Sequence, residues 1–208
     1  MTAFSEVVRT EAALRGILGV PAERAVRKEI ARLDSHCRAL IAGSPFVLVA
    51  SCNAARRCDV SPKGDPPGFV LVLDDETLAL PERPGNRRAD TFINVLENPH
   101  VGLLFVIPGK LETLRVNGRA QIVRDAWLRE RMSVAGKLPE LALVVTVEQV
   151  FIHCGKCMLR SAIWAAETWP DASALPTQAE CLVDHARLDE SVAEVDESIQ
   201  RSRRMGLY

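Results

Sequence analysis

The chain has 208 residues, of which 48% are hydrophobic and 25% are charged, and its formal net charge at pH 7 is −1. These values are typical of a globular protein and exclude a disordered chain, a collagen-like fibre and a coiled coil. Near neutrality also excludes a general basic field that would hold nucleic acid. Of the 26 basic residues, 21 are Arg. Genomic base composition accounts for such an excess unless the arginines cluster.

No targeting or membrane segment is expected. Charged residues from Glu6 to Arg15 interrupt the first twenty positions, which excludes the apolar run of a signal peptide. No stretch approaches the ~20 apolar residues of a membrane span. Six cysteines are spread thinly along the chain and are expected to be reduced thiols. We therefore expect a cytoplasmic protein that binds neither a membrane nor nucleic acid.

The predicted elements change character along the chain. Apolar residues at helical spacing predict one helix over 21–42, and from Pro45 short apolar runs between turn residues are typical of strands. We expect strands at 46–52, 59–61, 69–73, 77–80, 101–107, 112–123 and 141–154, and helices at 87–97 and 125–136. The charge-rich segment 177–204 predicts a further helix, packed on the body or on a partner chain.

Several strands with few intervening helices predict an α+β fold, built as a mostly antiparallel small barrel flanked by helices. We divide the chain into an N-terminal helical segment (1–44), a barrel domain (45–165) and a C-terminal helical tail (166–208). Internal repeats and low-complexity linkers are absent from the sequence. The barrel domain is therefore where the function is expected.

The most informative segment is the arginine-rich turn at 81–88, Pro-Glu-Arg-Pro-Gly-Asn-Arg-Arg, which leaves a strand and opens a helix. A helix start offers free N–H groups and partial positive charge, and Arg adds forked donors for phosphate oxygens. The alternative is a solvated charged turn in which Asn86 caps the helix. No glycine-rich nucleotide motif is present. A phosphate bound here would depend on Arg side chains and a helix end.

Two further segments carry weaker signals. Ser61 and Lys63 are two residues apart, so in an extended chain they face the same side and could hold a phosphate or a ring edge. A plain turn explains them as well. Thr113, Arg115 and Asn117 alternate with apolar residues and share one strand face, as in any half-solvated strand.

A Cys-x-x-Cys pair at Cys154 and Cys157 leaves three interpretations open. The pair could bind zinc together with Cys52 and Cys58 or with His153, or act as a redox dithiol. It could also consist of small buried or interface residues. The spacing of Cys52 and Cys58 is poor for a zinc knuckle, and we expect no metal site.

In their order along the chain, these segments resemble the pyridoxamine 5′-phosphate oxidase-like flavoproteins, the FMN-binding split-barrel family. The resemblance rests on Ser-Pro-Lys-Gly at 61–64, the turn at 83–88 through Asn-Pro at 98–99, and the strands at 101–105 and 114–120. It covers roughly residues 40–165 and implies a six-stranded antiparallel split β-barrel flanked by helices. It also implies a homodimer, with FMN bound in the groove between two barrels.

The resemblance assigns roles to residues of the turn by position. Arg87 and Arg88 would hold the FMN phosphate, with Arg83 and Asn86 in support. This agrees with the chemistry, because a nearly dianionic phosphate suits paired Arg donors at a helix end.

Other positions follow from the same resemblance. Ser61 and Lys63 would lie beside the isoalloxazine and ribityl chain, and Thr113 replaces a glutamine that often reaches the ring edge. Arg115 could meet the phosphate or the partner chain. A segment near the last strand, expected to approach the flavin of the other subunit, adds Lys156, Arg160, Ser161 and Trp164.

The resemblance thus implies an FMN-dependent oxidoreductase acting on an unidentified small molecule stacked on the flavin. Alternatives are a non-catalytic flavin-binding or redox-sensing protein, a relative using F420 or haem, and a domain without a cofactor. The true oxidases end in a Trp- and Arg-bearing segment that binds the vitamin B6 substrate, whereas this chain continues into the helical tail. Oxidation of pyridoxamine phosphate is therefore not expected, and no catalytic acid or base stands out.

Overall fold

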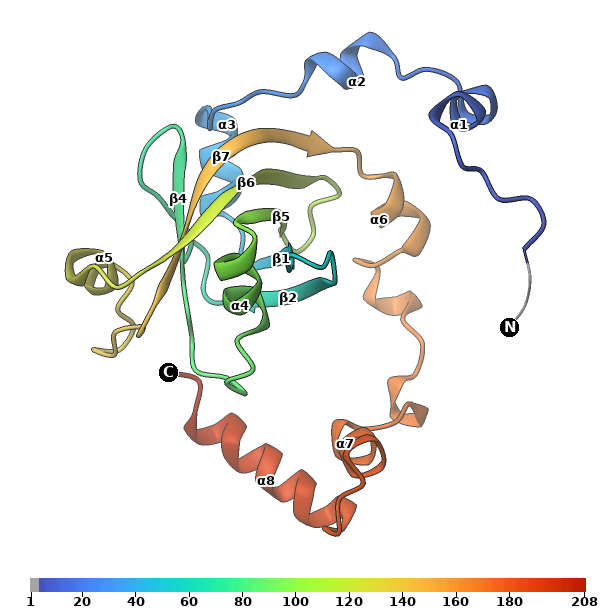
Figure 1. The fold of residues 1–208 in the computed structure, drawn as a ribbon. Helices are drawn as coiled ribbons and strands as arrows, with labels where there is room; N and C mark the ends of the chain where they lie inside the picture. The colour runs from blue at the N-terminus through green and yellow to red at the C-terminus, as the bar shows by residue number, and fades with distance from the viewer. Residues whose placement is uncertain (1–3) are drawn as a thin grey trace.

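The computed structural model describes residues 4–208 and contains one curved antiparallel sheet flanked by helices (Figure 1). The seven strands are ordered β2-β1-β5-β6-β7-β4-β3, and all adjacent pairs are antiparallel. Their bounds are β1 (Phe46–Cys52), β2 (Cys58–Gly64), β3 (Leu71–Val72), β4 (Thr77–Pro81), β5 (His100–Val106), β6 (Thr113–Val123) and β7 (Ala142–His153). The predicted α+β class is confirmed. The sheet does not close, and its seven strands match the seven expected from the sequence, one more than the six-stranded barrel that the resemblance implies.

The strands form where apolar residues alternate with others. In β1, Val47 and Val49 are fully buried, and in β5, Leu103 and Phe105 are 1% exposed. Cross-strand pairing places Val49 opposite Leu103 and Val47 opposite Phe105. These side chains therefore share the inner face of the sheet, where removal from water stabilises the fold.

Eight α-helices surround or extend from the sheet. They are α1 (Glu11–Leu18), α2 (Glu23–Arg27), α3 (Ser35–Ala42), α4 (Asp90–Glu97), α5 (Ala126–Arg131), α6 (Lys156–Ser161), α7 (Gln178–Ala186) and α8 (Val192–Met205). Two short 3-10 helices, η1 (Ala166–Thr168) and η2 (Ala172–Ala174), join α6 to α7. Within residues 4–208, none of these helices is both long and apolar enough to cross a membrane.

The prediction of one helix over 21–42 was wrong. Ile30 exchanges two backbone hydrogen bonds with Val150 of β7, at 3.0 and 2.7 Å, which holds the chain extended between α2 and α3. The side chain of Asp34 then accepts the N–H of Cys37 at 2.8 Å and begins α3. A pairing with a strand 120 positions away therefore overrides local helical periodicity.

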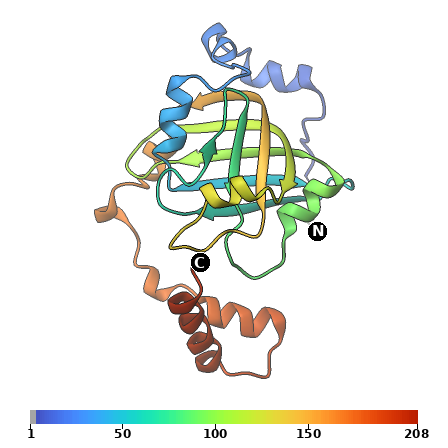
Figure 2. The same ribbon diagram turned by 90° about the vertical axis from the view of Figure 1, so that its left-hand side faces the viewer.

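The tail contains two helices instead of the single one expected. Arg187 ends α7 in the left-handed region (φ 51°), and Ser191 and Glu194 form a capping box that begins α8. The two helices pack against each other. They lie away from the sheet in both views, and the chain then returns beside the end of β4 (Figures 1 and 2).

Candidate functional site

A polar cavity of about 400 Å³ lies between β2, the end of β4 and the start of α4. Two segments that the sequence predicted as candidate ligand-binding segments, 61–63 and 83–88, come together at this cavity although they are separated in the sequence. Residues of both segments line the cavity, together with one aromatic ring of α4: Ser61, Lys63, Arg83, Asn86, Arg88 and Phe92. The signals read separately from the sequence thus converge on one place.

Strand pairing explains why Ser61 and Lys63 face this cavity. Ser61 is paired with Val49 and Lys63 with Val47, so both side chains lie on the inner face of the sheet, toward α4. The ammonium of Lys63 lies 5.7 Å from the ring centroid of Phe92. The predicted common face of Ser61 and Lys63 is confirmed.

The turn that leads into α4 has an unusual backbone. Arg87 (φ 60°) and Ala89 (φ 56°) both occupy the left-handed region, which is costly for residues other than glycine and is concentrated at functional sites. The side-chain oxygen of Asn86 accepts the N–H of Arg88 at 3.0 Å. Asn86 therefore closes the turn and does not cap the helix. Ala89 is the N-cap, and among residues 4–208 no side chain caps the N–H groups of the first turn of α4.

The cations of the cavity are paired with carboxylates. The Arg88 pair is exposed, with 70% of the Arg88 side chain accessible, and the hydrogen bond and charge of Asp90 raise the pKa of Arg88. The Arg83 pair is buried, with the side chain of Asp65 1% exposed. The three pairs are Lys63–Glu82 (2.9 Å), Arg83–Asp65 (2.6 Å) and Arg88–Asp90 (2.8 Å). An anion that enters the cavity would therefore replace Glu82 as the partner of Lys63 and Asp90 as the partner of Arg88.

Arg87 is exposed in the same turn and is not part of the cavity lining. A role for Arg87 at a phosphate stays a prediction.

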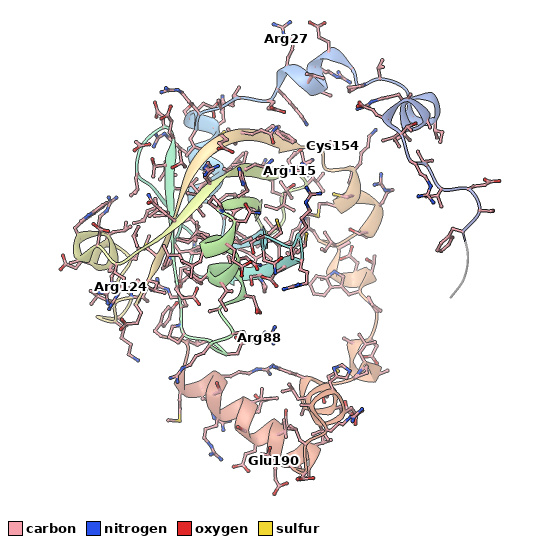
Figure 3. The ribbon with its side chains drawn as sticks, in the orientation of Figure 1. Arg27, Arg88, Arg115, Arg124, Cys154 and Glu190 are labelled. Carbon is pink, nitrogen blue, oxygen red and sulfur yellow. The ribbon has the colours of Figure 1, made fainter. Side chains whose placement is uncertain are left out.

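Thr113 and Arg115 lie on the opposite face of the sheet from the cavity. Their neighbours Leu114 and Val116 are buried in the core, so both residues lie on the outer face, where Arg115 is exposed and Thr113 is only 6% exposed. The guanidinium of Arg115 lies 5.2 Å from the ring centroid of Phe151 on β7. In Figure 3, Arg115 lies near Cys154 and far from Arg88. Within one chain, Thr113 and Arg115 therefore do not join the cavity.

The same outer face holds His153, which pairs in register with Thr113. Its Nε2 atom is buried and has no hydrogen-bond partner among residues 4–208. Burial, together with the positive charges of Arg115 and Lys28, lowers the pKa of His153. The shift favours the neutral form of the ring.

The late candidates occupy α6 and the segment after it. Trp164 Nε1 donates to the backbone oxygen of Lys110 at 2.8 Å, and Ser161 Oγ donates to that of Met158 at 3.2 Å. Lys156 and Arg160 are exposed. This segment follows the end of β7 (Figure 1), and none of its residues lines the cavity.

All six cysteines are free, and both Cys154 and Cys157 are exposed at the start of α6. In the described part of the chain, no group of three His, Cys, Asp or Glu side chains is placed to hold a metal ion. The zinc interpretation of the Cys-x-x-Cys pair therefore finds no support in this geometry.

An apolar hollow of about 310 Å³ lies on the outer face of β1, β2, β5 and β6. Val60 on this face is 58% exposed. The hollow is lined by Leu48, Ala50, Val60, Gly102, Leu103, Leu104, Arg115 and Asn117. An exposed apolar sheet face of this kind is typical of an interaction surface.

Sequence reasoning missed the acidic and aromatic partners of the cavity. Asp65 directly follows the Ser-Pro-Lys-Gly segment and Glu82 precedes Arg83, so both positions were open to recognition. Tyr208 contacts Arg83 and Asp65, but no local pattern connects it with residues more than 120 positions earlier.

An open antiparallel sheet with flanking helices, and a cation-lined cavity at an uncapped helix start, define a split-barrel protein of the α+β class. The chain belongs to the pyridoxamine 5′-phosphate oxidase family, whose model matches residues 33–154, more than half of the sequence. The family resemblance read from the sequence is thus confirmed. No curated protein matches the chain.

Several solved structures are similar in fold. HupZ of Group A Streptococcus is 22% identical, with a TM-score of 0.47 over 57% of this chain and 92% of that one. General stress protein 26 of Bacillus anthracis is 13% identical, with a TM-score of 0.44 over 55% and 88%. An FMN-binding protein of Syntrophomonas wolfei is 12% identical, with a TM-score of 0.43 over 55% and 86%.

Proposed function

We propose that the cavity binds the phosphate end of FMN and that the protein is a flavin-dependent oxidoreductase. The observation that carries this proposal is the convergence of Ser61, Lys63, Arg83 and Arg88 at the uncapped start of α4. Free N–H groups at a helix start and Arg side chains are the donors that a dianionic phosphate prefers. Membership of the pyridoxamine 5′-phosphate oxidase family supports a phosphate-bearing flavin over other anions.

The donor set fits such a group. Arg88 is largely exposed, so it can turn from Asp90 to a phosphate oxygen at small cost. Ser61 adds a hydroxyl donor on the same wall. Bound flavin would supply the redox chemistry, while the chain binds and orients it.

We further propose that the protein is a homodimer, in which a second copy covers the apolar outer face of β1, β2, β5 and β6. The exposed Val60 and the hollow beside it would then be buried. In such a dimer, Thr113 and Arg115 of one copy would approach the flavin at the interface. The residues of α6 and beyond, Lys156, Arg160, Ser161 and Trp164, would join them from the same side.

The experiment begins with the absorbance spectrum of the purified protein and identification of the released cofactor by mass. Apoprotein is then titrated with FMN and with riboflavin, which lacks the phosphate. Replacing both Arg87 and Arg88 with Ala is expected to cost on the order of 1.5–3 kcal/mol of FMN binding free energy, because Arg88 lines the cavity and Arg87 does not. Riboflavin binding should hardly change.

A matched control replaces Arg24 and Arg27 of the exposed helix α2 with Ala, which should alter neither affinity. A protein that binds no flavin, or a double variant that retains the wild-type affinity for FMN, would contradict the proposal. Sedimentation of the protein as a monomer would contradict the dimer.

A further inference from the structure

The last residues of the chain return to the barrel beside the end of β4 (Figure 1). The hydroxyl of Tyr208 donates to Asp65 Oδ1, and the Tyr208 ring lies 5.4 Å from the guanidinium carbon of Arg83. Lys137 Nζ donates to the backbone oxygen of Tyr208 at 2.7 Å. Three contacts with distant parts of the barrel therefore hold this residue in place.

Asp65 is the centre of this arrangement. Its side chain is 1% exposed, and a carboxylate buried to this extent requires donors for its oxygens. Arg83 Nε donates to Oδ2 at 2.6 Å, and Tyr208 donates to Oδ1. Each oxygen thus has one donor, and Tyr208 supplies one of the two.

The guanidinium group of Arg83 is held at one edge by a hydrogen bond and on one face by an aromatic ring. Within residues 4–208, its hydrogen bond to Asp65 uses Nε alone, which leaves both Nη groups available to another acceptor. The Tyr208 ring covers the guanidinium as a cation–π partner. Arg83 also lines the cavity, and its side chain is 16% exposed. A planar donor of this type matches an oxyanion with two parallel hydrogen bonds, and a plane that is already held loses less side-chain entropy when they form.

We propose that Tyr208 is a positioning residue for the phosphate site. Together with Asp65, it fixes the guanidinium of Arg83 so that the Nη groups serve the phosphate of a flavin in the cavity. This inference rests on the proposed function. It adds that the end of the tail, and not only the barrel, determines how the protein distinguishes a phosphorylated flavin from an unphosphorylated one.

The test measures the dissociation constants of apoprotein for FMN and riboflavin in Tyr208→Leu, which removes the ring and the hydroxyl, and in Tyr208→Phe, which keeps the ring. Tyr208→Leu is expected to weaken FMN binding about tenfold while riboflavin binding is unchanged. Tyr208→Phe should fall between Tyr208→Leu and wild type. Leu207→Ala, at a neighbouring residue that is 70% exposed, is the matched control and should leave both constants unchanged.

A second arm asks whether Tyr208 acts through Arg83. In an Arg83→Ala background, Tyr208→Leu should cause no further loss of FMN affinity, because the group that it positions is gone. Inorganic phosphate, used as a competitor of FMN, should lose potency in parallel in Tyr208→Leu. Thermal unfolding verifies that each variant is folded.

Equal losses for FMN and riboflavin, or unchanged constants in Tyr208→Leu, would overturn the positioning role and leave the proposed function intact. An additional loss in the Arg83→Ala background would do the same. If the wild-type protein itself fails to prefer FMN over riboflavin, the proposed function fails, and this inference fails with it.

Discussion

Lys63 Nζ lies 2.9 Å from Glu82 Oε2, and both side chains line the same cavity. The pair is partly exposed, with 23% of the Lys63 side chain and 29% of the Glu82 side chain accessible. A phosphate entering the cavity would compete with the Glu82 carboxylate for the ammonium. The negative charge of Glu82 therefore opposes anion binding in a cavity that is otherwise rich in hydrogen-bond donors.

Glu82→Gln is expected to raise the affinity of the apoprotein for FMN about threefold to tenfold, because a charge that repels the phosphate is removed. Titration calorimetry measures the effect, with riboflavin as the reference ligand. Glu112→Gln, in the exposed pair with Lys110, should leave both affinities unchanged. A fall in FMN affinity in Glu82→Gln would instead mean that Glu82 holds Lys63 in place for the ligand.

A buried hydrogen bond joins α4 to strand β1 of the sheet. Asn94 Nδ2 donates to Ser51 Oγ at 2.9 Å, and both residues are buried. Asn94→Ala should lower the free energy of unfolding by about 1–3 kcal/mol, since it leaves the Ser51 hydroxyl buried without this partner. Urea unfolding measures the change. Ile93→Ala, at the adjacent residue that is 51% exposed, should change stability by about 0.5 kcal/mol or less.

The β6–β7 pairing has a register shift between Asn117 and Gly118. A Cβ atom at Gly118 would lie 2.0 Å from the backbone oxygen of Thr146, so the strands must separate to accept any side chain. Gly118→Ala is expected to destabilise the fold by about 3 kcal/mol. Gly16→Ala, in the exposed helix α1 with nothing within 4 Å, is the control and should leave global stability unchanged. Equal stability of the two variants would refute the close approach.

His153 predicts a pH dependence of stability. Its pKa is lowered below the ordinary 6.5 by burial and by the charges of Arg115 and Lys28. The unfolded chain therefore takes up this proton at a higher pH than the folded chain. The contribution is fully present above about pH 6.5 and is lost as the pH falls through the lower folded pKa.

The measurement compares the free energy of unfolding against pH for the wild type and for His153→Gln. The variant should show a flatter decline below pH 6.5, while His185→Gln, at an exposed residue of α7, should follow the wild type. NMR titration of the His153 ring should give a midpoint below 6.5. A midpoint at or above that value would disprove the expected sign.

Much of the sheet could be predicted because apolar residues alternate with other residues along its strands, and this pattern is visible in the sequence. The strand expected at 46–52 is β1, and that at 101–107 is β5 within one residue at each end. Helix boundaries were predicted less accurately where they depend on contacts with residues far away in the sequence. The pairing of Ile30 with Val150 divided the helix expected over 21–42, and no local pattern signals that pairing.

The residues predicted for the candidate site likewise fall into two groups, of which only one lines the cavity. The turn at 83–88 and the strand at 61–63 carried recognisable donors, and the structure brings them to one cavity. Thr113 and Arg115 carried equally suitable donors, yet the pleat of β6 places them on the other face of the sheet. In the proposed dimer, a second copy would bring them to the flavin.

By itself, the sequence determined the α+β class, the family and the basic residues that come to line the cavity, because backbone periodicity and helix-start chemistry act over a few neighbouring residues. Only the tertiary structure decided which donors share a cavity, that Asp65 and Glu82 pair with its cations, and that Tyr208 reaches Arg83. The reason is physical. These contacts depend on strand register and on where the tail returns to the barrel, and both are set by the packing of the whole chain.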